Sequence, residues 1–122
     1  MLSEILLLHG NMKNVEQMLV RYDQLLREQL SNPYLTNAEI AEHIGLSERT
    51  LYRYVQNAYG ISPNHYLRRL RLDRAEALLR SGDYRTIKEV ALRVGYRKIP
   101  YFTRLFEEDR GVHPQDILRE HE

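Results

Sequence analysis

Residues 36–63 read TNAEIAEHIGLSERTLYRYVQNAYGISP, and residues 86–114 read TIKEVALRVGYRKIPYFTRLFEEDRGVHP. Both segments carry a threonine with a glutamate three positions later, then a β-branched residue followed by alanine, a glycine, and finally a Gly…Pro pair. Matching residues lie 50 positions apart as far as the first glycine and 51 positions apart after it. An internal repeat of this density indicates a duplicated structural unit.

Each copy of the repeat predicts a helix, a tight turn and a second helix. The Thr-x-x-Glu pattern is a capping box that starts a helix. The glycine supplies a residue for the tight turn, and Ser47 caps the second helix of the first copy. We expect helices at Asn37–Ile44, at about Glu48–Tyr59, at Ile87–Val94 and at about Ile99–Asp109. Two helices joined by a short turn that contains glycine are typical of a helix-turn-helix unit.

The flanking sequence is helical in period as well. Apolar residues recur every three or four positions over Asn14–Ser31 and again over Asn64–Ser81, and no segment alternates long enough to predict a sheet. The expected fold is therefore all-α. The second of these helices joins the two repeats and would span about 27 Å, which suits two second helices that enter successive major grooves about 34 Å apart.

Composition restricts the classes of protein. The chain has 122 residues and no cysteine, so it fits one domain, or two very small ones, without disulfides or thiolate metal sites, and it suits a reducing cytoplasm. The longest apolar run, Ile5–Leu8, is too short to cross a membrane. Net charge is only +1, but residues 47–104 hold thirteen Lys and Arg against five Asp and Glu. This basic middle either presents a positive face to phosphate or forms ordinary solvated helix faces.

Enzyme chemistry finds no support in the sequence. The five histidines are scattered without metal-ligand spacing, and there is no glycine-rich phosphate loop and no nucleophile beside a base. We therefore expect no catalytic activity, no cofactor and no metal.

The ordered motifs of the chain resemble the DNA-binding domain of the AraC/XylS family over about residues 15–119. The resemblance rests on these motifs: Ile40-Ala41-x3-Gly45-Leu46-Ser47, Leu51-x-Arg53, Gly60-Ile61-Ser62-Pro63, Tyr66-Leu67-x3-Arg71-Leu72-x2-Ala75-x2-Leu78-Leu79, Ile87-x2-Val90-Ala91-x3-Gly95-Tyr96, Tyr101-Phe102-Thr103-Arg104-x-Phe106 and Gly111-x2-Pro114. It implies a monomeric, double-stranded DNA-binding unit of about seven helices. In that unit the second helix of each copy enters the major groove.

Carried over by position, the resemblance assigns contacts to both second helices. The base-reading candidates are Arg49, Tyr52 and Arg53 in the first copy, and Ile99, Pro100, Thr103 and Arg104 in the second. The candidate phosphate contacts are Ser47, Gln56 and Lys98. Arg49 and Arg53 lie four positions apart and so share one helix face, and a planar guanidinium can bond guanine O6 and N7 together.

The second copy departs from the family pattern, so we expect the first to carry more sequence specificity. Ile99 and Pro100 offer no hydrogen bonds to bases, and Lys98 stands where a small capping residue is expected. Residues 107–109 are acidic where the family is more often basic, and Arg110 replaces an aromatic residue.

We also predict structural roles for one arginine and for most of the tyrosines. Arg71 matches the family pattern beside Leu72 and is expected to be structural. Of the tyrosines in the repeats and their linkers, we expect only Tyr52 to be more than a residue at the edge of the core.

The expected organisation is an N-terminal extension or stub at residues 1–13, a first helix-turn-helix subdomain at 14–62, a linker helix at 63–82 and a second subdomain at 83–122. Residues 1–13 could form a short docking helix, a dimer contact or the stub of an upstream domain, and we expect no effector-sensing domain in this chain. The expected partners are double-stranded DNA and, secondarily, RNA polymerase, in the bacterial cytoplasm at the nucleoid. The alternative is a helical protein-interaction module that contacts a partner regulator or RNA polymerase.

Overall fold

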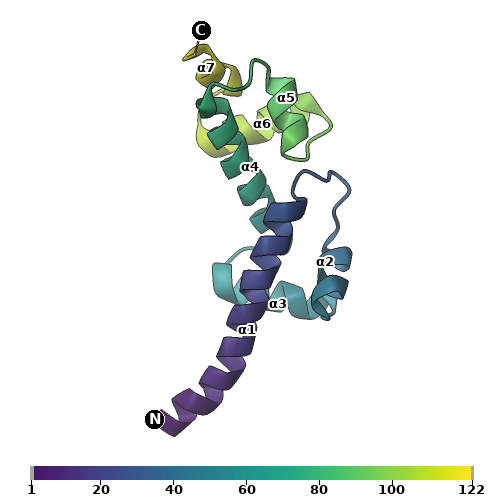
Figure 1. The fold of residues 1–122 in the computed structure, drawn as a ribbon, viewed down its shortest axis with the longest axis vertical. Helices are drawn as coiled ribbons and strands as arrows, with labels where there is room; N and C mark the ends of the chain where they lie inside the picture. Colours follow the sequence, from purple (N-terminus) through teal and green to yellow (C-terminus); the bar gives the residue numbers. More distant parts are fainter. Residues whose placement is uncertain (1, 122) are drawn as a thin grey trace. The chain divides into compact units, whose positions relative to one another are not determined.

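Seven helices and no strands make up residues 2–121, the part of the chain that the computed structural model describes, with side chains described for residues 14–121 (Figure 1). The helices are α1 (Leu2–Gln29), α2 (Asn37–Ile44), α3 (Glu48–Tyr59), α4 (Pro63–Ser81), α5 (Ile87–Arg93), α6 (Ile99–Arg110) and α7 (Pro114–Arg119). The predicted all-α fold of about seven helices is confirmed.

The predicted helix starts follow from local capping. The Thr36 Oγ1 accepts a hydrogen bond from the Glu39 backbone N–H at 3.2 Å, and the Thr86 Oγ1 does the same for Glu89 at 3.1 Å. Ser47 caps α3 by accepting from the Thr50 N–H at 3.1 Å. Each cap satisfies a backbone donor that has no partner inside the helix, so these helices begin where the sequence predicts.

The N-terminal helix differs from the prediction. We expected a helix over Asn14–Ser31 and left residues 1–13 open as a short docking helix, a dimer contact or a stub, but the backbone of α1 runs without a break from Leu2 to Gln29. The three suggested roles of residues 1–13 depend on side chains that lie outside the described ones, so those roles stay predictions.

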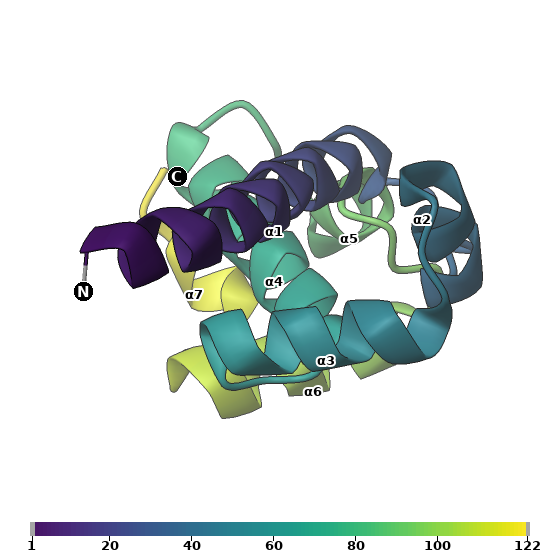
Figure 2. The same ribbon diagram turned by 90° about the horizontal axis from the view of Figure 1, so that it is seen from below.

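The chain divides into two compact units. Unit 1 holds the residues up to Glu28 together with Thr36–Tyr66, and unit 2 holds Gln29–Leu35 together with the residues from Leu67 onwards. In unit 1, α2 lies across one end of α3 (Figure 2). In unit 2, α5, α6 and α7 gather beside the C-terminal part of α4 (Figure 1). The linking segment Gln29–Leu35 thus belongs to the second unit, although it stands before α2 in sequence.

Apolar side chains on one face of each helix form the two cores. In unit 1 the fully buried side chains include Tyr22, Leu26, Leu51 and Val55. In unit 2 they include Leu72, Leu79, Val90, Phe102, Phe106 and Ile117. Ala41 and Ala91 are 1% and 0% exposed, so both matching alanines of the repeat lie inside the cores.

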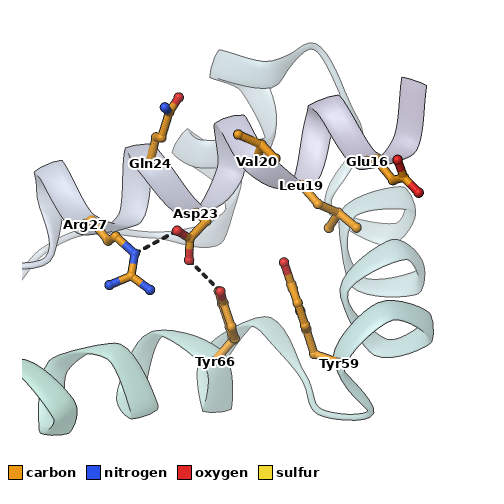
Figure 3. A pocket seen from close by; sticks show the side chains of 8 residues that line it. All are labelled: Glu16, Leu19, Val20, Asp23, Gln24, Arg27, Tyr59 and Tyr66. Atoms are coloured by element: carbon orange, nitrogen blue, oxygen red, sulfur yellow. Dashed lines mark hydrogen bonds and ion pairs between the residues drawn. The ribbon is translucent and has the colours of Figure 1, made fainter. Parts of the chain in front are cut away.

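A cluster of tyrosines joins α1, α3 and α4 within unit 1. Tyr66 stacks on Tyr59, with ring centroids 4.4 Å apart, and on Tyr22, at 5.7 Å. The Tyr66 hydroxyl donates to Asp23 at 2.5 Å, and Arg27 donates to the same carboxylate at 2.7 Å (Figure 3). Burial, together with the hydrogen bond to Asp23, raises the pKa of Tyr66. The side chain therefore stays neutral as a hydrogen-bond donor.

Beside this cluster lies a groove of about 720 Å³. Its lining consists of Glu16, Leu19, Val20, Asp23, Gln24, Arg27, Tyr59 and Tyr66 (Figure 3). Because Asp23 is already bonded to Arg27 and Tyr66, its carboxylate serves the packing of α1 against α4.

Candidate nucleic-acid interface

Helix α3 has one buried face and one exposed face. Leu51 and Val55 are buried, whereas Arg49, Tyr52, Arg53 and Gln56 are exposed, Tyr52 by 51%. Tyr52 and Arg53 lie three and four positions after Arg49, and Gln56 lies four and three positions after them, so all four share one face of the helix. The structure therefore brings together the three predicted base-reading residues of the first copy and one predicted phosphate contact.

The two arginines of this face carry charge that no carboxylate among residues 14–121 neutralises. Neither Arg49 nor Arg53 forms an ion pair with an acidic side chain of residues 14–121. The Arg53 guanidinium instead lies over the Tyr54 ring, 5.4 Å from its centroid. A cation over an aromatic face keeps its charge and its outward N–H groups, so this side of α3 can bind an acceptor or an anion.

Helix α6 repeats the arrangement with fewer polar groups. Phe102, Leu105 and Phe106 are buried. Of the predicted base-reading residues, Pro100 and Arg104 are exposed, and Ile99 and Thr103 are half-buried. Arg104 lies over the Tyr101 ring at 5.4 Å. Only Thr103 and Arg104 of these four can form side-chain hydrogen bonds to a base edge.

The start of α6 lacks the cap that the start of α3 has. Ser47 both accepts from the Thr50 N–H and donates to the Thr50 Oγ1 at 2.9 Å. Lys98 occupies the N-cap position of α6 and makes no side-chain cap hydrogen bond. The expectation that Lys98 is a poor cap is confirmed. Its exposed ammonium instead places a positive charge at the helix start.

Two arginines, Arg71 and Arg110, form contacts within unit 2. The Arg71 Nε donates to the Leu30 carbonyl at 2.9 Å, and its Nη2 donates to the Asn32 carbonyl at 2.8 Å, which confirms the structural role expected for Arg71. Arg110, in place of an aromatic residue, pairs with Asp73, with Glu76 at 3.3 Å and with Asp109 at 2.8 Å. It thereby ties the end of α6 to α4.

Tyr34 and Arg97 form an exposed pair that sequence reasoning missed. Tyr34 was expected at the edge of the core, which is wrong because its side chain is 63% exposed. The Arg97 guanidinium lies over its ring, 5.0 Å from the centroid. The two residues are far apart in sequence and no local motif links them, so only the tertiary structure reveals the pair.

The described residues do not meet the requirements of a metal site or of a membrane-spanning helix. Among the described residues, no group of three or more His, Cys, Asp and Glu side chains is arranged to hold a metal ion. Within the same part of the chain, no helix is long and apolar enough to span a membrane.

Two helix-turn-helix units, each presenting an exposed face of its second helix, define a DNA-binding domain of the kind found in transcription regulators. Residues 40–120 match the family model described as a helix-turn-helix domain. The chain belongs to the AraC family, of which this is the DNA-binding domain.

Curated relatives are longer than this chain. The transcriptional activator RhaS of Salmonella arizonae is 40% identical over 78 residues, which cover 64% of this chain and 28% of that protein. The chain therefore matches little more than a quarter of the relative's length.

Solved structures match over a larger share. The C-terminal domain of AraT, a response regulator from Geobacillus stearothermophilus, is 33% identical with a TM-score of 0.77 and 84% coverage of both chains. A transcriptional regulator with an AraC-type DNA-binding domain from Chromobacterium violaceum has 25% identity, a TM-score of 0.79 and coverage of 87% and 93%. The DNA-binding domain of AdpA, solved with a target DNA, has 25% identity, a TM-score of 0.76 and coverage of 84% and 91%.

Proposed function

We propose that this chain binds specific sequences of double-stranded DNA through the exposed faces of α3 and α6 and so regulates transcription at the bacterial nucleoid, with no catalytic step. The observation that carries the proposal is the exposed face of α3. There, Arg49 and Arg53 are held opposite the buried Leu51 and Val55 and have no carboxylate partner among residues 14–121. The DNA-bound neighbour AdpA supports the same use of the fold.

The proposed division of labour follows from the donors on each helix. Arg49, Tyr52 and Arg53 of α3 read bases, while Ser47 and Gln56 contact phosphates. On α6, Thr103 and Arg104 read bases by hydrogen bonds, Ile99 and Pro100 contact thymine methyl groups or read shape, and Lys98 contacts phosphate. Since α3 offers more polar groups, it carries more of the specificity.

The proposed complex occupies two adjacent major grooves. Each unit presents one second helix, α3 in unit 1 and α6 in unit 2. Successive major grooves on one side of B-DNA lie about 34 Å apart. A bipartite site of two half-sites about ten base pairs apart is the expected result.

Selection of bound sites from random duplex DNA tests the proposal first. Two conserved blocks separated by about one helical turn are expected, the block read by α3 being the better defined. A single block would show that only one helix reads bases. Absence of any enriched sequence would contradict specific recognition.

Substitution of the arginines tests the base reading itself. Arg53→Ala is expected to weaken binding to the selected site by about 1–3 kcal/mol, roughly 5- to 150-fold, and to relax base preference at one position. Arg119→Ala removes an exposed charge from α7 and serves as the matched control. Equal losses by Arg53→Ala on selected and random DNA would instead assign Arg53 to phosphate contact.

A second candidate function is a protein-interaction module that contacts RNA polymerase or a partner regulator. The exposed acidic residues Glu107, Glu108 and Asp109 favour it, because they face solvent on the helix proposed to approach DNA. Salt dependence separates the two candidates. A steep loss of duplex affinity with added salt indicates phosphate neutralisation, and no duplex binding at low salt would leave the interaction module as the function.

A further inference from the structure

The segment between α1 and α2 is built onto the turn of the second helix-turn-helix. Arg71 holds the Leu30 and Asn32 carbonyls through the two hydrogen bonds described above, and its guanidinium also lies over the Tyr96 ring at 5.6 Å. The backbone of Gly95 approaches the Leu30 carbonyl so closely that a Cβ atom at Gly95 would overlap it. The segment and the turn are therefore locked together within unit 2.

These contacts place Tyr34 close to the N-terminal end of α6. The Asn32 side-chain oxygen accepts from the Tyr34 backbone N–H at 3.0 Å, which fixes the turn that carries the ring. The ring is 63% exposed, more than a core position would require, and it carries the Arg97 guanidinium at 5.0 Å. Arg97 stands two residues before Ile99, the first residue of α6.

The Arg97 guanidinium has a different kind of partner from the guanidinium groups of several other arginines in the chain. Arg80 and Arg119 lie against carboxylates, at 3.3 Å in each case, and so have their charge neutralised within the protein. Arg97 has no acidic side chain of residues 14–121 within ion-pair distance and rests on a neutral ring. Stacking limits the rotamers of a long side chain, yet leaves its full charge and its edge N–H groups for an anion. The exposed Lys98 beside it adds a second positive charge.

We propose that Arg97 is a phosphate-contacting residue of the second helix-turn-helix and that Tyr34, contributed by the segment before α2, is its positioning residue. This inference rests on the proposed DNA binding and extends it to two residues outside the recognition helices. The start of a recognition helix lies close to the sugar-phosphate backbone when the helix enters the major groove. Orienting the guanidinium before binding removes part of the entropy cost of ordering it on DNA.

The positioning step can be tested without DNA. In the free protein the Arg97 Nε–H resonance is expected to show an upfield ring-current shift that is retained in Tyr34→Phe and lost in Tyr34→Leu. Because the Tyr34 side chain is exposed, neither substitution opens a cavity in the core. Thermal unfolding of each variant checks that the fold is kept. A resonance that does not respond to Tyr34→Leu would overturn the positioning role.

The phosphate contact is tested by the salt dependence of duplex affinity. Arg97→Ala is expected to reduce the slope of log K against log salt by about 0.9, the value for one phosphate, equally on selected and random duplexes. Arg119→Ala, which removes the same charge from an exposed pair on α7, is expected to leave the slope unchanged. Tyr34→Leu is expected to weaken binding in the wild-type background and to have no further effect in the Arg97→Ala background.

The outcomes separate the two proposals. If the wild-type protein binds duplex DNA with a steep salt dependence but Arg97→Ala keeps the full slope, the Arg97 assignment is wrong while the DNA-binding proposal stands. If Tyr34→Leu acts equally in both backgrounds, Tyr34 does not work through Arg97. If the wild-type protein shows no salt-dependent duplex binding, both proposals fail together.

Discussion

Replacing Gly95 with alanine is expected to destabilise the second helix-turn-helix much more than replacing Gly45 destabilises the first. Both glycines occupy the tight turn of their unit, and both have left-handed backbone angles, with φ of +92° at Gly95 and +86° at Gly45. An L side chain in this region costs about 1–2 kcal/mol. That cost is common to both substitutions, which makes Gly45→Ala the matched control.

The surroundings of the two turns set the difference. A Cβ at Gly45 would meet no atom within 4 Å. A Cβ at Gly95 would overlap the Leu30 carbonyl oxygen and lie 2.9 Å from the Arg71 Nε. The backbone of the segment before α2 must then move, and the hydrogen bond from Arg71 to Leu30 is lost. A hydrogen bond to a charged group contributes about 1.5–3 kcal/mol, so Gly95→Ala is expected to cost about 2.5–5 kcal/mol in total.

Urea denaturation followed by circular dichroism measures the free energy of unfolding of each variant. Native-state hydrogen exchange then locates the loss, because amides of α5 and α6 should lose protection in Gly95→Ala and those of α2 and α3 in Gly45→Ala. Equal destabilisation by the two substitutions would refute the reasoning, since it would mean that the close approach at Gly95 carries no energetic weight.

Three further outcomes are expected. Lys98→Ser should raise the stability of α6 by about 0.5–1 kcal/mol because it supplies the missing N-cap acceptor, and Lys98→Ala, measured by the same urea denaturation, should give no such gain. In low salt, Arg110→Ala should lower the free energy of unfolding by about 1–2 kcal/mol more than Arg119→Ala does, because three carboxylates on α4 and α6 lose their cation. A difference that persists in 1 M salt would show that Arg110 acts through packing instead. Burial raises the pKa of both Tyr22 and Tyr66 above the ordinary value of 10.0, so these tyrosines ionise in the unfolded chain before they ionise in the folded one. Their contribution to stability is therefore fully present below about pH 10 and is lost as the pH rises further. Urea midpoints measured between pH 8 and 11 should fall at the alkaline end, less so in Tyr66→Phe, and a midpoint that does not change with pH would contradict this prediction.

The repeat predicted the helix-turn-helix units well because the signals for helix starts and turns are local. Thr36, Thr86 and Ser47 act on backbone groups three residues away, so a short stretch of sequence is enough to place α2, α5 and α3. The exposed face of α3 was predictable for the same reason. A helix period that buries Leu51 and Val55 necessarily exposes Arg49 and Arg53.

Contacts between distant segments could not be predicted in this way. The sequence presents Gly45 and Gly95 as equivalent turn glycines, yet only Gly95 is enclosed, because the segment 29–35 packs on that turn. The sequence offers Arg110 as a departure from the family, and the tertiary structure shows that Asp73 and Glu76 of α4 supply its partners.

What the sequence determined by itself is the all-α architecture, the duplication and the residues on each exposed helix face, since these follow from periodicity and from caps that act within one turn. Only the tertiary structure decided that the segment before α2 belongs to the second unit and that Tyr34 lies under Arg97. The physical reason is that this arrangement depends on Arg71 reaching two backbone carbonyls about forty positions earlier in the chain. No local pattern of side chains encodes such a contact.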